Sequence, residues 1–206
     1  MRKSRLETAR TRPHIVKTAA TVVKRRGVTD AALAGLMTEA GLTHGAFYRH
    51  FASKDDLLIE ALKASLAEMA RRCDAALSTD QASGMSPVID LYLSPSHRDQ
   101  VEKGCPLAAL GSELARRTPR ERLVVTSGFL DIIEVLAAAS PSRNRRQATR
   151  DALAVFSTLL GAITLARIVS DDRLSKDILA AARTAIAPKR RQMLAKNGTG
   201  SHRTRQ

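Results

Sequence analysis

The sequence predicts an all-α protein with a small N-terminal unit and a larger helical domain. Hydrophobic residues make up 44% of its 206 residues, and they are mostly alanine and leucine, which favour helix over sheet. Apolar positions recur at helical spacing along most of the chain, and no stretch alternates as a strand does. A chain of this length fits one large domain or two small ones and can bury a sizeable core.

The first helix is expected from about Arg12 to Arg26. Pro13 suits its first turn, where no amide hydrogen is needed, and Gly27 follows as a stop signal. The apolar residues at helical spacing are Ile15, Ala19, Val22 and Val23.

Two short helices are expected next. The first covers about 31–40, with Thr29 or Asp30 as N-cap, and ends at Gly41, which can adopt positive φ. Thr43 then caps the second, over 44–51. Two short helices joined by a tight glycine turn predict a helix-turn-helix.

The remaining helices are longer. Ser53 caps one of about 22 residues, and Asp56 pairs with it as in a capping box. Beyond a turn-rich stretch, we expect helical segments over 87–94, 105–117, 119–139, 146–170 and about 175–194. Pro119 fits the first turn of the third of these, and Pro188 is expected to bend or end the last.

The charge points to a polyanionic partner. The formal net charge is +14, and the first 26 residues carry nine Lys/Arg against Glu7 alone. Nucleic acid and an anionic membrane surface both fit this balance. No run of 18 apolar residues occurs, so we expect no membrane span, and no apolar segment follows the basic N-terminus as in a secretory signal. The only cysteines, Cys73 and Cys105, lie far apart, which favours a reducing, cytoplasmic setting.

The stretch 41–51, GLTHGAFYRHF, concentrates three of the six aromatic residues of the chain. His44 and His50 lie about 120° apart around a helix, which is the wrong angle for a shared metal ion, and no cysteine or carboxylate completes a ligand set. No nucleophile neighbours either histidine on a helical face, and no phosphate-binding glycine loop is present. We therefore expect no catalytic residue, metal ligand or cofactor.

The same stretch suits insertion into a nucleic-acid groove. Phe47 and Phe51 share one helix face and can pack inward, whereas His44 and Tyr48 share another. Gly45 beside them allows a close approach of the backbone. Thr43 and His44 lie at a helix N-terminus, where a phosphate is favoured and short polar side chains reach base edges. The side chains that can donate to phosphates are Tyr48, Arg49, His50 and Lys54.

The run GLTHGAFYRHFASKDDLL resembles the DNA-binding signature of TetR/AcrR-type transcriptional repressors, and the resemblance covers about residues 12–65. It implies a helix-turn-helix DNA-binding domain over 1–55 (motif about 31–51), a ligand-binding and dimerisation domain over 56–195, and a basic tail over 196–206, which we expect to be disordered. The DNA-contacting positions would be Thr29, Thr43, His44, Gly45, Tyr48, Arg49, His50 and Lys54.

The resemblance also implies a homodimer on a near-palindromic double-stranded DNA operator, released by an unknown small-molecule effector. The segment 152–169 is apolar nearly all round, and we expect it to form the dimer interface with 175–186, unless it is only the core helix of its own domain. The basic arm either contacts DNA or is a solvated tail, and its cations are Arg2, Lys3, Arg5, Arg10 and Arg12. An architectural, nonspecific DNA-binding protein is the alternative function.

The effector is less defined. Candidate pocket residues are Tyr92, Cys105, Leu107, Leu110, Phe129, Ile133 and Phe156. Cys105 lies near a helix N-terminus and close to Lys103, and both would lower its pKa. It is therefore a candidate sensing thiol for an electrophile, with a small buried hydrophobe as the other interpretation.

Overall fold

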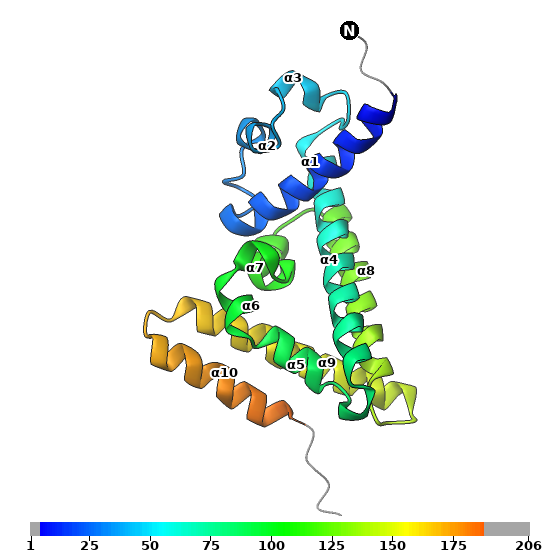
Figure 1. The fold of residues 1–206 in the computed structure, drawn as a ribbon, viewed down its shortest axis with the longest axis vertical. Coiled ribbons are helices and arrows are strands. Elements are labelled where there is room, and N and C mark those ends of the chain that lie inside the picture. The colour runs from blue at the N-terminus through cyan, green and yellow to red at the C-terminus, as the bar shows by residue number, and fades with distance from the viewer. Residues whose placement is uncertain (1–4, 188–206) are drawn as a thin grey trace, which may run out of the picture.

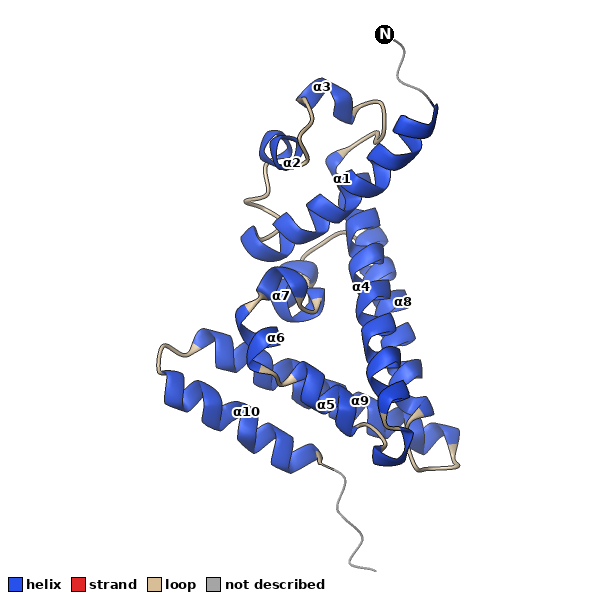
Figure 2. Ribbon diagram, viewed as in Figure 1, coloured by secondary structure: helices blue, strands red, loops and turns tan. Residues whose placement is uncertain are grey.

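The computed structural model describes the backbone of residues 5–187 and the side chains from residue 11. Ten α-helices and two short 3-10 helices, η1 (Gln81–Ser83) and η2 (Val101–Lys103), make up this part of the chain, which has no strand (Figures 1 and 2). The all-α prediction is confirmed. The helices are α1 (Arg5–Arg26), α2 (Leu33–Glu39), α3 (His44–Phe47), α4 (Lys54–Thr79), α5 (Ser86–Tyr92), α6 (Pro95–Asp99), α7 (Pro106–Leu114), α8 (Pro119–Ala138), α9 (Arg145–Ile168) and α10 (Asp172–Ile186).

Helices α1, α2 and α3 form the small N-terminal unit with the first half of α4. Figure 1 shows α1 crossing the beginning of α4, with α2 and α3 on the far side of α1. Ile15, Met37 and Phe47 are almost fully buried in the apolar cluster that joins these helices. Burial of such side chains contributes about 1.5–3 kcal/mol each, which holds the short helices in place.

Helices α4 and α8 lie side by side and connect this unit to the base of the molecule, where α9 and α10 run (Figure 1). Gly128 of α8 permits the close approach, since a Cβ there would lie 2.6 Å from Cβ of Leu66 on α4. A second apolar cluster fills the space between α4, α5, α8 and α9. Its rings meet edge to face, with centroids of Tyr92 and Phe156 5.6 Å apart.

Several expected helix ends are confirmed. The Ser53 hydroxyl accepts a hydrogen bond from the Asp56 N–H at 3.1 Å, and Pro119 is the first residue of α8. Gly27 and Gly41 have φ of 86° and 68°, as helix-terminating glycines commonly do.

Other expectations are wrong. Helix α1 begins at Arg5, so Pro13 lies inside it; the favourable helix formers before Thr11 extend the helix past the proline. Ala32 is the N-cap of α2 in place of Thr29 or Asp30. The short helix α6 was not expected, and α7 ends at Leu114. The predictions for Pro188 and for 196–206 lie outside the described residues.

Helix α9 differs from its neighbours in composition. Within the described residues it alone is long and apolar enough to cross a membrane by length and composition, although the sequence has no run of 18 apolar residues. This is weak evidence for a span, because the core helix of a globular protein passes the same test. One third (33%) of its most apolar window is buried, and Leu153, Leu165 and Ile168 are exposed. Its apolar surface thus exceeds what the chain itself covers.

Candidate nucleic-acid interface

The recognition element is a short helix held by a glycine turn. Gly41 reverses the chain after α2, and the N–H of Leu42 donates to the Met37 carbonyl at 2.8 Å. Thr43 precedes α3 in extended conformation, but its side chain makes no capping hydrogen bond. After Phe47 the helix loosens into a turn that brings Phe51 back toward the core.

The predicted inward face is confirmed. Phe47 and Phe51 are 0% and 3% exposed, and their rings stack with centroids 5.6 Å apart. The guanidinium of Arg12 lies 4.4 Å from the Phe51 ring centroid. These contacts fix the orientation of α3 against α1 and α4.

The opposite face of α3 is open to solvent. Tyr48 is 63% exposed, and Thr43, His44, Gly45 and Arg49 are exposed as well. The rings of His44 and Tyr48 meet edge to face at 5.7 Å, and a Cβ added to Gly45 would meet nothing within 4 Å. Five of the eight predicted DNA-contacting residues are therefore exposed on α3 or directly beside its ends.

The other three make hydrogen bonds within the fold, although Thr29 does so through its backbone N–H and is itself exposed. Lys54 Nζ donates to the Val28 carbonyl at 3.2 Å, and the Thr29 N–H donates to Glu113 at 3.3 Å. His50 is half-buried, and its carbonyl accepts a hydrogen bond from Arg12. Arg12 also pairs with Glu60, so this cation of the predicted arm has partners within the fold. The other arm cations lie outside the side chains that the structure describes.

The candidate pocket residues are largely core. Tyr92, Cys105, Leu110, Ile133 and Phe156 are buried, and Leu107 and Phe129 pack partly buried against them. Leu110 belongs to the apolar cluster of the N-terminal unit, whereas the other four buried residues belong to the second cluster.

Cys105 is not an activated thiol. Complete burial raises its pKa, and this outweighs the hydrogen bonds and the Lys24 charge that favour the thiolate. Burial also raises the pKa of Cys73 to about 12. The predicted lowering by Lys103 is therefore wrong, because the local sequence does not reveal how deeply the thiol is buried.

His97 is a structural residue that the sequence did not reveal. Its Nδ1 lies 2.7 Å from the Tyr92 carbonyl, and its Nε2 accepts the Cys105 N–H at 3.0 Å. Both contacts are satisfied by a neutral ring that is protonated on Nδ1. Burial lowers the pKa of His97 to about 4. The ring connects α5, α6 and the start of α7 inside the larger domain.

The N-terminal unit matches a known family. The sequence model of the bacterial regulatory proteins of the tetR family matches residues 15–61, from α1 into α4. The HTH-type transcriptional regulator AcrR of Shigella flexneri is 39% identical over 59 residues, which are 29% of this chain and 27% of AcrR. That match bears on the DNA-binding region alone.

Two further similarities extend over most of the chain. An uncharacterized HTH-type transcriptional regulator of Mycobacterium tuberculosis is 26% identical over 174 residues, covering 78% of this chain and 86% of that relative. The crystal structure of a TetR transcriptional regulator from Chloroflexus aurantiacus superposes with a TM-score of 0.71 at 26% identity, covering 88% of this chain and 94% of that one.

A helix-turn-helix unit with an open recognition face, joined to a larger helical domain, defines a DNA-binding regulator of two domains. The chain is a transcriptional regulator of the TetR/AcrR family. Members of this family are DNA-binding transcription factors and not enzymes, which agrees with the sequence prediction.

Proposed function

We propose that this chain represses transcription as a homodimer on a near-palindromic operator and that a small molecule bound in the larger domain releases it. The observation that carries the DNA-binding part is the exposed face of α3, formed by Thr43, His44, Gly45, Tyr48 and Arg49. Side chains at the start of a recognition helix reach base edges in the major groove. Lys54, His50 and Thr29 would join them at the phosphates. A chromosomal operator would place the protein in the cytoplasm.

The apolar surface of α9 and α10 supports the homodimer. Leu165 and Ile168 at the end of α9 are 54% and 72% exposed. Leu174, in the first turn of α10, is exposed as well. Helices that expose large apolar residues commonly mark an interface. A two-fold pair presents its recognition helices one or more DNA turns apart, so an inverted repeat is the expected operator.

The larger domain is the proposed effector site. Its core joins Tyr92, Phe129 and Phe156 around α5, α8 and α9. Because both thiols are buried with raised pKa, we favour an effector that binds without covalent chemistry over an electrophile. Such an effector would act by shifting the population of DNA-competent orientations.

The test begins with selection of a duplex from a random library by the full-length protein. Operator binding of Tyr48→Ala and His44→Ala is then compared with that of Leu123→Ala, an exposed apolar residue on α8. We expect Tyr48→Ala to weaken binding to all duplexes, because a phosphate contact is lost, and His44→Ala to relax base preference by about 1–3 kcal/mol. Full operator affinity in both α3 variants would show that this face does not dock DNA.

A further inference from the structure

Helix α7 belongs to both domains of the molecule. Its N-cap, Cys105, is fully buried in the apolar cluster of the larger domain. Further along the helix, Leu110 and Leu114 are buried in the cluster of the N-terminal unit, at 1% and 4% exposure. A helix is stiff over nine residues, so a displacement at one end is transmitted to the other.

The C-terminal end of α7 also holds the loop that leads into α2. Glu113 Oε2 accepts hydrogen bonds from the N–H groups of Val28 at 2.8 Å and Thr29 at 3.3 Å. Gly27 makes room for this carboxylate, since a Cβ there would lie 2.8 Å from Glu113 Oε1. Hydrogen bonds to an ionised acceptor are roughly twice as strong as neutral ones.

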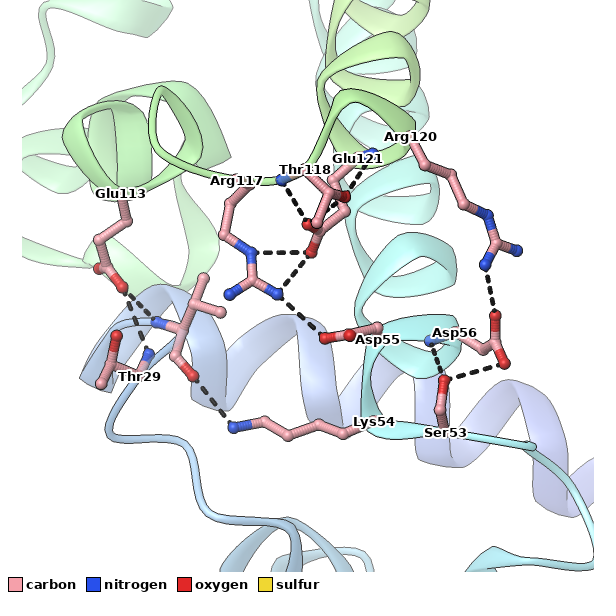
Figure 3. Close-up of polar contacts among 11 residues, drawn as sticks. Thr29, Ser53, Lys54, Asp55, Asp56, Glu113, Arg117, Thr118, Arg120 and Glu121 are labelled. Atoms are coloured by element: carbon pink, nitrogen blue, oxygen red, sulfur yellow. Dashed lines mark hydrogen bonds and ion pairs between the residues drawn. The ribbon is translucent and has the colours of Figure 1, made fainter.

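Lys54, the first residue of α4, binds the same loop. Its Nζ donates to the Val28 carbonyl at 3.2 Å, so Val28 is bound at its N–H by α7 and at its carbonyl by α4 (Figure 3). The backbone of one residue is thereby fixed between the two domains.

A second set of contacts ties the corner between α7 and α8 to the start of α4. Arg117 pairs with Asp55 at 3.0 Å and with Glu121 at 2.7 Å, and Arg120 pairs with Asp56 at 3.0 Å (Figure 3). Glu121 is 1% exposed, whereas both aspartates are more accessible. The buried carboxylate of Glu121 fixes the Arg117 side chain. Arg117 in turn pairs with Asp55 on α4, the helix that follows α3.

We propose that residues 113–121 form the joint that sets the orientation of the helix-turn-helix on the larger domain, with Glu113 as the positioning residue. Its consequence for regulation rests on the proposed function: an effector that moves α7 in the core would release the loop at Val28. Glu113 does not touch DNA in this proposal and acts through the loop alone.

The orientation can be measured by a distance within one chain. Spin labels are placed on cysteines introduced at Ala34 of α2 and Ser127 of α8, both exposed, while native Cys73 and Cys105 are buried. The labelled chain is diluted with unlabelled chain, so that only distances within one chain are recorded. We expect one narrow distance in the parent and a clearly broader or shifted distribution in Glu113→Ala. Glu113→Gln should fall between them, because the amide keeps an acceptor but loses the charge.

The matched control is Glu134→Ala, which removes the same charge from an exposed ion pair with Arg145 far along α8. An unchanged distance distribution in folded Glu113→Ala overturns the proposal, even if the protein melts earlier. If Glu113→Ala does not fold, Glu113→Gln takes its place. An unchanged distance distribution in Glu113→Gln then overturns the proposal. A merely stabilising carboxylate would lower the melting temperature without changing this distance.

A second measurement connects the joint to DNA binding. We expect Glu113→Ala to bind the selected duplex about tenfold more weakly. Without the Glu113 hydrogen bonds, the N-terminal unit would adopt its DNA-binding orientation only part of the time. Glu134→Ala should bind like the parent. Equal affinity of both variants overturns the regulatory part of the proposal. Failure to select any duplex would count against the proposed function, while the distance measurement, which needs no DNA, still tests the joint.

Discussion

The exposed Tyr48 and the buried Phe47 are neighbours in sequence with opposite roles. Spacing was sufficient to separate them, because residues four apart on a helix share a face and one face must pack on α1. The structure confirms this with 63% exposure for Tyr48 and 0% for Phe47. Roles that depend on distant partners could not be predicted in this way. Lys54 reaches Val28 and Arg12 reaches Glu60, and neither partner is close in sequence.

His97 provides a pH-dependent test at the residue scale. Its pKa is lowered from 6.5 to about 4 by burial, so the unfolded chain binds the proton first as the pH falls. Stability is therefore complete above about pH 6.5 and is lost progressively toward pH 4. The integrated effect is roughly 3 kcal/mol.

Urea unfolding between pH 4 and 7 measures this dependence. We expect His97→Gln to be less stable at pH 7 and to lose most of the pH dependence over that interval. His44→Gln, an exposed control, should retain it. The same slope in His97→Gln as in the parent would mean that another group is responsible.

At the scale of elements, the sequence predicted the number of long helices better than their ends. Ser53, Pro119, Gly27 and Gly41 acted locally, as capping and turn residues do, and the structure confirms them. Helix α2 begins later than its predicted caps, and the N–H groups of Val28 and Thr29 are bound by Glu113, more than 80 residues away, which no local pattern predicts. The predicted start of α1 is wrong because Pro13 indicates a helix start in the local sequence, whereas the helix runs through this proline from Arg5.

The contact between α4 and α8 predicts a contrast between two helical glycines. Gly128→Ala should destabilise the protein by about 1–3 kcal/mol, because the added methyl group would overlap Leu66 at its Cβ, which cannot rotate away. Gly111→Ala on α7 meets nothing within 4 Å and should be neutral or stabilising by up to about 1 kcal/mol. Chemical denaturation of the two variants checks both signs. Equal stabilities would contradict the close packing at Gly128.

At the scale of the whole molecule, the surplus of apolar surface on α9 predicts association. Replacing both Leu165 and Ile168 with glutamate should give a folded monomer, because charges cannot be buried unpaired at an interface. Leu123→Glu on α8, equally exposed in the single chain, should leave the oligomeric state unchanged. Sedimentation equilibrium distinguishes these outcomes. A dimer that survives the double substitution would place the interface elsewhere.

The net charge of +14 bears on affinity more than on specificity. Operator affinity should fall steeply with salt, which a nonspecific basic protein would show as well. The recognition face on α3 is what separates a regulator from such a protein.

Sequence discrimination is therefore the most direct measurement. The dissociation constants of the full-length protein for its selected duplex and for a scrambled duplex of the same composition should be compared at one salt concentration. We predict that the selected duplex binds at least about 10³-fold more tightly. We also predict that combining His44→Ala with Tyr48→Ala removes most of that ratio. Equal affinity for the two duplexes would contradict an operator-reading role for α3.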